Sequence, residues 1–93
     1  MSMNTVRDNR ERSRYELDVD GEQAFIDYRR ESGVVTLLHA EVPAASRGGG
    51  IGAALVAGTL AMVRREGERV VPRCPFVALY IRRHPEFKDL LAS

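Results

Sequence analysis

One glycine-rich segment, Arg47-Gly48-Gly49-Gly50-Ile51-Gly52, has the composition of a binding site for an anion. It lies between a predicted strand and a predicted helix. Glycines allow the backbone to approach a ligand closely, and the first N–H groups of a helix, together with the helix dipole, favour negative charge. The segment therefore predicts a site suited to a pyrophosphate. A flexible connection whose glycines only ease a tight turn is the structural alternative.

Two familiar nucleotide sites can be tested against this segment. A P-loop requires Gly-Lys-Ser or Gly-Lys-Thr, which does not follow here. A dinucleotide fingerprint is present in a variant form, Gly48-x-Gly50-x-x-Ala53. Its acidic residue is missing, because Val71 and Pro72 stand where the next strand ends. The P-loop is excluded, and the dinucleotide site lacks a required group.

A polar pair lies toward the end of the third predicted strand. Successive strand residues point to opposite faces, so His39 and Glu41 share one face, opposite Leu38, Ala40 and Val42. A histidine beside a carboxylate at the end of a strand suits proton transfer. The alternative is a buried histidine and a salt bridge at the rim.

The single cysteine, Cys74, precedes Pro75 at the predicted start of a helix. The helix dipole and the neighbouring Arg73 would favour its thiolate form, which is the nucleophilic one. A lone cysteine is also commonly a small buried apolar residue, so chemistry and packing both remain open for Cys74.

The elements that position these residues follow from periodicity and turn signals. Alternation predicts strands over 13–19 and 23–29, joined by the turn Asp20-Gly21, and a third, mostly apolar strand over 34–42. Helical spacing predicts a helix over 51–66 that stops at Gly67. A strand over 69–71, a helix over 75–83 and a helical turn over 85–91 complete the chain, while residues 1–11 are expected to be flexible.

This order predicts a small mixed α+β fold in one domain, residues 1–93. Three sequential strands with tight turns form an antiparallel meander. The crossover helix then makes the fourth strand parallel to the third, and a C-terminal helix follows.

Composition narrows the class of protein further. The 93 residues are 44% hydrophobic and 29% charged, the balance of a folded domain. Fourteen Lys and Arg residues against thirteen Asp and Glu residues leave a formal charge of +1, which argues against a nucleic-acid partner. The longest uncharged stretch, 48–63, is too short to span a bilayer, and charged residues near the N-terminus argue against a signal peptide. One cysteine favours the cytoplasm and excludes a cysteine metal cluster.

Arg47-x-x-Gly50-x-Gly52 also matches the R/Q-x-x-G-x-G/A signature of the GNAT N-acetyltransferase superfamily, at the strand–loop–helix junction where that superfamily carries it. From about residue 13 to residue 90 the chain resembles the shortest, single-domain branch of the superfamily. The segments that carry the resemblance besides the glycine loop are 38–43 (LHAEVP), 71–76 (VPRCPF) and 80–87 (YIRRHPEF).

The resemblance implies that acetyl-CoA binds in a cleft where the third and fourth predicted strands splay apart. The backbone from Arg47 to Gly52 would hold the pyrophosphate, and the strand end at Val42 would pair with the pantetheine arm. Cys74 would lie beside the cofactor thiol. Tyr80 lies in the second helix, where larger relatives often carry a tyrosine that protonates the departing CoA thiolate. The chain has no room between its first two predicted strands for the helices that usually shape the acceptor site.

We therefore expect an acetyl-CoA-dependent N-acetyltransferase, with His39 as general base and Cys74 as a thiol relay or covalent acceptor. Its partner would be a small-molecule or protein amine, with no nucleic acid and no membrane involved, and the chain would be a monomer or weak dimer. A non-catalytic acyl-CoA-binding or interaction module is the main alternative. A small DNA-binding regulator is disfavoured by the near-neutral charge.

Overall fold

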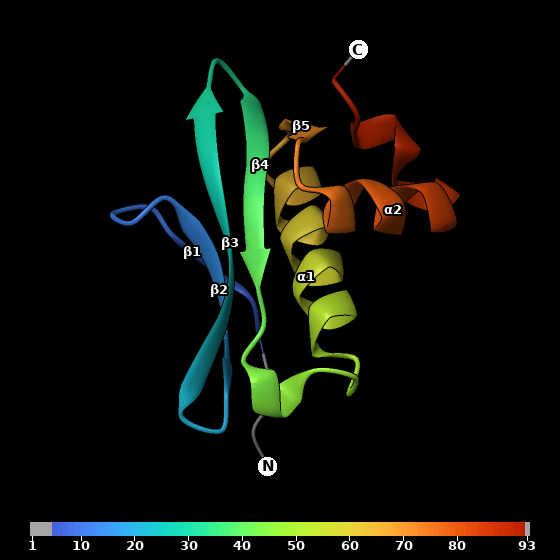
Figure 1. The fold of residues 1–93 in the computed structure, drawn as a ribbon. Helices are drawn as coiled ribbons and strands as arrows, with labels where there is room; N and C mark the ends of the chain where they lie inside the picture. The colour runs from blue at the N-terminus through green and yellow to red at the C-terminus, as the bar shows by residue number, and fades with distance from the viewer. Residues whose placement is uncertain (1–4, 93) are drawn as a thin grey trace.

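A five-stranded sheet carries two α-helices on one side in the structure, a computed structural model that describes residues 5–92 (Figure 1). The strands are β1 (Arg7–Asn9), β2 (Arg14–Val19), β3 (Glu22–Glu31), β4 (Val34–Glu41) and β5 (Arg69–Pro72). The helices are α1 (Ile51–Arg65) and α2 (Pro75–Arg83), with short 3-10 helices at Ala44–Ser46 and Pro85–Leu90. The spatial order is β1-β2-β3-β4-β5, antiparallel except for the parallel β4–β5 pair. The predicted mixed α+β fold, with its meander, crossover helix and parallel last strand, is confirmed.

Two hairpins set the register of the meander. Asp20 and Gly21 join β2 to β3, and Ser32 and Gly33 join β3 to β4, all four with positive φ. Two-residue turns of this kind match the right-handed twist of the flanking strands, which is why the Asp-Gly and Ser-Gly pairs specify them.

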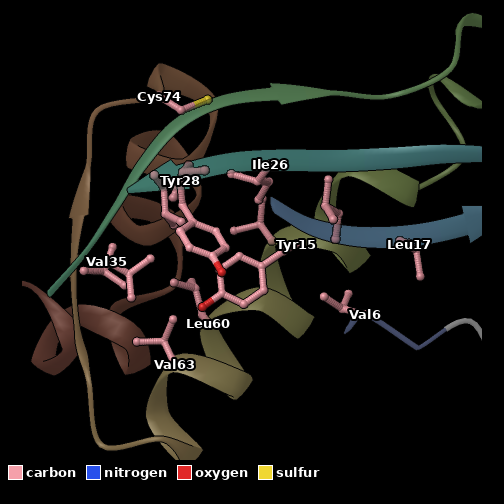
Figure 2. Packing of buried hydrophobic residues seen from close by; sticks show 14 of the residues in the cluster. Val6, Tyr15, Leu17, Ile26, Tyr28, Val35, Leu60, Val63 and Cys74 are labelled. Carbon is pink, nitrogen blue, oxygen red and sulfur yellow. The ribbon is translucent and has the colours of Figure 1, made fainter. Parts of the chain in front are cut away.

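The core lies between the sheet and the helices (Figure 2). Alternate residues of β2, β3 and β4 point toward α1, while α1 turns residues at three-to-four spacing toward the sheet. The fully buried apolar side chains include Tyr15, Leu17, Ile26, Val35, Leu37, Leu55, Val56, Leu60, Val63, Val70 and Val77. The opposite face of β2–β4 is called the outer face below. It carries mainly polar side chains, and Figure 1 shows no helix of the described chain over it.

Residues 7–9 differ from the sequence expectation of a flexible N-terminal segment, because they form β1. Val6 is buried against α1 at Gly58, where the helix has no side chain to keep it away. The Asp8 carboxylate accepts a hydrogen bond from the Tyr28 hydroxyl at 2.6 Å. These long-range contacts order the strand. Residues 1–4 of the segment lie outside the described residues.

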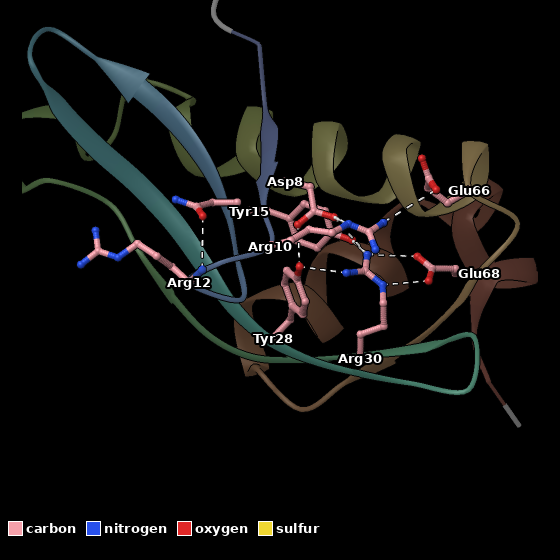
Figure 3. A network of polar contacts seen from close by, with 9 residues as sticks. Asp8, Arg10, Arg12, Tyr15, Tyr28, Arg30, Glu66 and Glu68 are labelled. Carbon is pink, nitrogen blue, oxygen red and sulfur yellow. Dashed lines mark hydrogen bonds and ion pairs between the residues drawn. The ribbon is translucent and has the colours of Figure 1, made fainter.

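A polar cluster ties β1 to the rest of the sheet (Figure 3). Arg30 donates to both carboxylate oxygens of Glu68, at 2.8 and 3.1 Å, and to the Tyr28 hydroxyl at 2.8 Å. It also donates to Asp8 at 3.2 Å and to the Tyr15 hydroxyl at 3.0 Å. Since each of the three guanidinium nitrogens donates to at least one partner, the cluster is a structural one.

Candidate active site

The geometry of the site begins with a β-bulge in β4. Asp27 pairs with His39, but the next residue of β3, Tyr28, pairs with Leu37, which leaves Leu38 as an extra residue. A bulge resets which face the following side chains occupy. Leu38 is exposed on the outer face, so the prediction that it lies opposite His39 is wrong.

The strands β4 and β5 pair only over a short length. Their register ends at Leu37 opposite Pro72, and the Cys74 N–H then donates to the Leu37 carbonyl oxygen at 3.0 Å. Beyond this point the chain turns into α2, and no described strand pairs with that edge of β4. The edge is therefore open to a ligand with amide groups.

The glycine-rich loop leads directly into α1. Gly48 and Gly50 have φ of 86° and 83°, the left-handed region that favours glycine, and Gly50 is the N-cap of the helix. No side chain caps this end, and the first turn contains no acidic residue. The first N–H groups of a helix have no partner within it, and α1 is 15 residues long. The start of α1 is thus suited to bind an anion from outside the chain.

Two hollows connect this loop with the open edge of β4, and together they are called the β4–α1 cleft. One, of about 300 Å³, is lined by Val42, Arg47, Gly48, Gly50, Gly52, Ala53 and Phe76. The other, of about 390 Å³, is lined by His39, Ala40, Glu41, Val42, Arg47 and Phe76. Because three residues belong to both hollows, the cleft runs from the helix start along the end of β4.

Phe76 forms one wall of the cleft and was not singled out as a site residue from the sequence. Its side chain is 45% exposed. A Cβ added at Gly52 would lie 2.8 Å from the Phe76 Cζ atom, so glycine is what allows the ring to lie against α1. An exposed phenylalanine one residue after Pro75 is the signal that could have found it.

Arg47 lies at the junction of the two hollows. Its Nε donates to the Val42 carbonyl oxygen at 3.1 Å, which folds the side chain back onto the end of β4. The guanidinium thereby brings positive charge into the cleft next to the free N–H groups of α1.

His39 and Glu41 are brought together as the sequence predicts. The His39 Nε2 and Glu41 Oε2 atoms are 3.1 Å apart, and both side chains are more than half exposed. A carboxylate can only accept a hydrogen bond, so Nε2 carries the proton in this pair. The neutral ring then has its lone pair on Nδ1, where it can accept a proton.

Cys74 is the N-cap of α2, with Pro75 at the first helical position, as predicted. Its side chain is 5% exposed and belongs to the buried cluster, at the margin beside β4 (Figure 2). Among the described residues it forms no side-chain hydrogen bond with His39, whose ring is bound to Glu41. Cys74 therefore lies next to the end of the β4–β5 pairing and is not hydrogen-bonded to the polar pair.

Tyr80 packs against a different histidine. Its ring stacks on His84, with 3.9 Å between ring centroids, and it is not among the described residues that line the β4–α1 cleft. Burial raises the pKa of Tyr80, and nearby Glu86 raises it further. The phenol is therefore held in its protonated form at neutral pH.

Residues 5–92 contain neither a metal-binding cluster nor a membrane-spanning helix. No group of three or more His, Cys, Asp or Glu side chains there could hold a metal ion. No helix in that range is long and apolar enough to cross a membrane.

Comparisons with known proteins agree with this geometry. The model of the GCN5-related N-acetyltransferase family matches residues 14–90. The fold is similar to the NMR solution structure of a GCN5-like protein from Staphylococcus aureus, with a TM-score of 0.69 and 15% sequence identity, over 100% of this chain and 92% of that one. Curated protein sequences give no match. With more than four fifths of its length matched by the family model, the chain belongs to the GCN5-related N-acetyltransferase family.

Proposed function

We propose that this protein transfers the acetyl group of acetyl-CoA to a primary amine. The observation that carries the proposal is that the glycine-rich start of α1 and the unpaired edge of β4 open into one cleft. The first can bind phosphates and the second can pair with amides. Acetyl-CoA has a pyrophosphate at one end and amides along the arm that leads to its thioester.

The N–H groups from Gly48 to Gly52 would bind the pyrophosphate, with Arg47 contributing positive charge. The pantetheine amides would pair with the edge of β4 near Val42. Since the Val42 carbonyl oxygen is bound by Arg47, the arginine side chain must leave that oxygen if the arm is to use it. The thioester would then reach the end of the β4–β5 pairing, near Leu37 and Cys74.

The transfer needs a base for the amine. The amine nitrogen attacks the thioester carbon, a C–N bond forms, the C–S bond breaks and CoA leaves as a thiolate. His39 Nδ1 would take the proton that the nitrogen loses, while Glu41 holds the ring through Nε2 and stabilises the imidazolium that results. The CoA thiolate then takes a proton, for which Tyr80 is the candidate donor predicted from the sequence.

Two routes for the acetyl group differ in whether Cys74 takes part. In a covalent route the acetyl group would pass from CoA to the Cys74 sulfur and then to the amine. In the direct route the amine attacks acetyl-CoA itself. The burial of Cys74 and its lack of a hydrogen bond with His39 favour direct transfer.

The experiment incubates the protein with acetyl-CoA and primary amines, and follows CoA release and the acetylated product by mass spectrometry. We expect product with wild type and a large loss with His39→Gln. Acetyl-CoA without amine tests the covalent route: an acetyl group on Cys74, absent in Cys74→Ala, would establish it. If Cys74→Ala matches wild type in rate, the thiol is structural. The melting curve of each variant is measured beside its rate.

Binding of acetyl-CoA without transfer to any amine would contradict the proposal and establish the non-catalytic acyl-CoA-binding module instead. We expect the acceptor to be a small-molecule or protein amine and the protein to act in the cytoplasm as a monomer or weak dimer. Gel filtration and light scattering measure the oligomeric state.

A further inference from the structure

A third hollow opens on the outer face of the sheet and is called the outer hollow. It has a volume of about 400 Å³ and is lined by Arg29, Glu31, Ser32, Val34, Thr36, Leu38 and Arg73. The volume is comparable to that of either hollow in the β4–α1 cleft. No residue of the outer hollow has a part in binding acetyl-CoA as proposed above.

The outer hollow reaches the place where the thioester is proposed to lie. Leu38 is the bulged residue of β4, between Leu37 and His39. Arg73 directly precedes Cys74, whose N–H is bound to Leu37. Leu38 of the outer hollow directly precedes His39 of the β4–α1 cleft, so ligands in the two hollows would approach one another near the end of the β4–β5 pairing.

Two arginines of the outer hollow have no partner for their guanidinium groups among the residues that the structure describes. Most arginines of the sheet are paired, as Arg7 is with Asp18 and Arg30 with Glu68. By contrast, the guanidinium groups of Arg29 and Arg73 form no hydrogen bond, ion pair or ring contact within residues 5–92. Both are exposed and free to bind an anion.

The register places these two arginines on either side of β4. Arg29 of β3 pairs with Thr36, and Arg73 follows Pro72, the partner of Leu37. Strands lie about 4.8 Å apart, so β3 and β5 are roughly 10 Å apart, a gap that two arginine side chains can close over an anion above Thr36. Glu31 is two pairs further along, opposite Val34, at the end away from Leu38.

We propose that the outer hollow binds the acetyl acceptor, and that this acceptor is a compact amine that also carries a carboxylate or a phosphate. Arg29 and Arg73 bind the anionic group, because the planar guanidinium matches both anions with two parallel hydrogen bonds. The Thr36 hydroxyl adds a donor. The amine then extends along β4 past Leu38 toward His39, which also faces the outer side of the strand. This inference rests on the proposed function and specifies its substrate class.

The test uses matched pairs of amines with wild-type protein and acetyl-CoA. The pairs are β-alanine with its neutral amide, and phosphoethanolamine with ethanolamine. They separate the carboxylate from the phosphate, and each amine that carries an anionic group from one that lacks it. Arg29→Ala and Arg73→Ala remove the two guanidinium groups, and Arg65→Ala serves as the control because Arg65 is exposed on α1 and lies outside the outer hollow.

We expect kcat/KM for at least one anionic amine to exceed that for its neutral partner by about tenfold or more, as charge-assisted hydrogen bonds allow. The ratio of the two kcat/KM values should fall toward one in Arg29→Ala and in Arg73→Ala, while the Kd for acetyl-CoA stays unchanged. The ratio should stay at its wild-type value in Arg65→Ala. Equal use of both members of each pair, or a preference that survives both substitutions, would overturn the proposal.

A second measurement separates this proposal from the function on which it rests. Amide shifts of Ser32 and Thr36 are followed by NMR while each anionic amine is added to the CoA-loaded protein. Transfer to neutral amines without such shifts overturns the acceptor class alone. Failure of acetyl-CoA to bind, or transfer to no amine of either kind, overturns the proposed function and this inference with it.

Discussion

Replacing Gly50 with Asp should weaken acetyl-CoA binding by putting a negative charge where the pyrophosphate is expected. Gly50 is the N-cap of α1 and has a φ of 83°. A Cβ built there meets no other atom within 4 Å, so a side chain has space. The left-handed conformation costs an ordinary L-residue about 1–2 kcal/mol, and Asn and Asp tolerate it best. Gly50→Asn is therefore the matched control, with nearly the same shape and no charge.

The size of the effect follows from Coulomb's law. Two unit charges about 4 Å apart repel by about 1 kcal/mol in water and by about 4 kcal/mol at the effective dielectric of a protein surface. Because Gly50 is exposed, the lower part of this range applies. About 1.4 kcal/mol corresponds to a tenfold change in Kd, so we expect Gly50→Asp to bind acetyl-CoA about tenfold more weakly than Gly50→Asn.

Isothermal titration calorimetry at two salt concentrations measures this difference. Raising ionic strength from 0.1 to 1 M shortens the Debye length from about 10 to about 3 Å, so the gap between the two variants should shrink. Pantetheine, which lacks phosphates, should bind both variants alike. Equal affinities of the two variants for acetyl-CoA at low salt would refute the assignment of the pyrophosphate to this loop.

Three further predictions concern packing and charge. Gly52→Ala should weaken acetyl-CoA binding by about 1 kcal/mol, or fivefold in Kd measured by calorimetry, because its Cβ forces the Phe76 ring to move. Arg30→Ala should lower the free energy of unfolding, measured in urea, by about 2–4 kcal/mol, since half-buried carboxylates lose their partner. The hydrogen bond from Arg64 lowers the pKa of Asp89, so Asp89→Asn should melt below wild type at pH 7. That gap in Tm should begin to narrow as the pH falls below about 4, the ordinary pKa of an aspartate, and should close once the pH is below the lowered pKa of Asp89 in the folded protein.

Each of these predictions has a control or a contradicting outcome. Arg65→Ala, which removes an exposed side chain of α1 outside the β4–α1 cleft, should bind acetyl-CoA like wild type. Arg65→Ala should leave the free energy of unfolding almost unchanged. If Arg30→Ala also left it almost unchanged, the structural role of the cluster would be contradicted. A difference in Tm between Asp89→Asn and wild type that does not shrink at all between pH 7 and pH 2 would contradict the role of the ion pair.

The elements that local signals specify could be predicted from the sequence. The Asp20-Gly21 turn, the stop at Gly67 and the proline at the start of α2 each act within a few residues, and the structure has all three. The glycine-rich loop was found for the same reason: its chemistry lies in one continuous segment.

Features that depend on distant contacts were missed. Strand β1 is short and polar, and what orders it is Val6 against Gly58 and Asp8 against Tyr28. The bulge at Leu38 depends on the pairing with β3 and has no signature in the alternation of β4 itself. The outer hollow likewise unites arginines from separate segments, which only the register brings to one place.

An NMR titration of 15N-labelled protein with acetyl-CoA tests most directly whether the β4–α1 cleft is the site of acetyl-CoA. The account predicts saturable shifts of the amides from Gly48 to Ala53 and of those from His39 to Val42, with smaller changes elsewhere. Shifts that spare both segments, or that gather instead at the separate hollow beside Arg69 and Asp89, would contradict it.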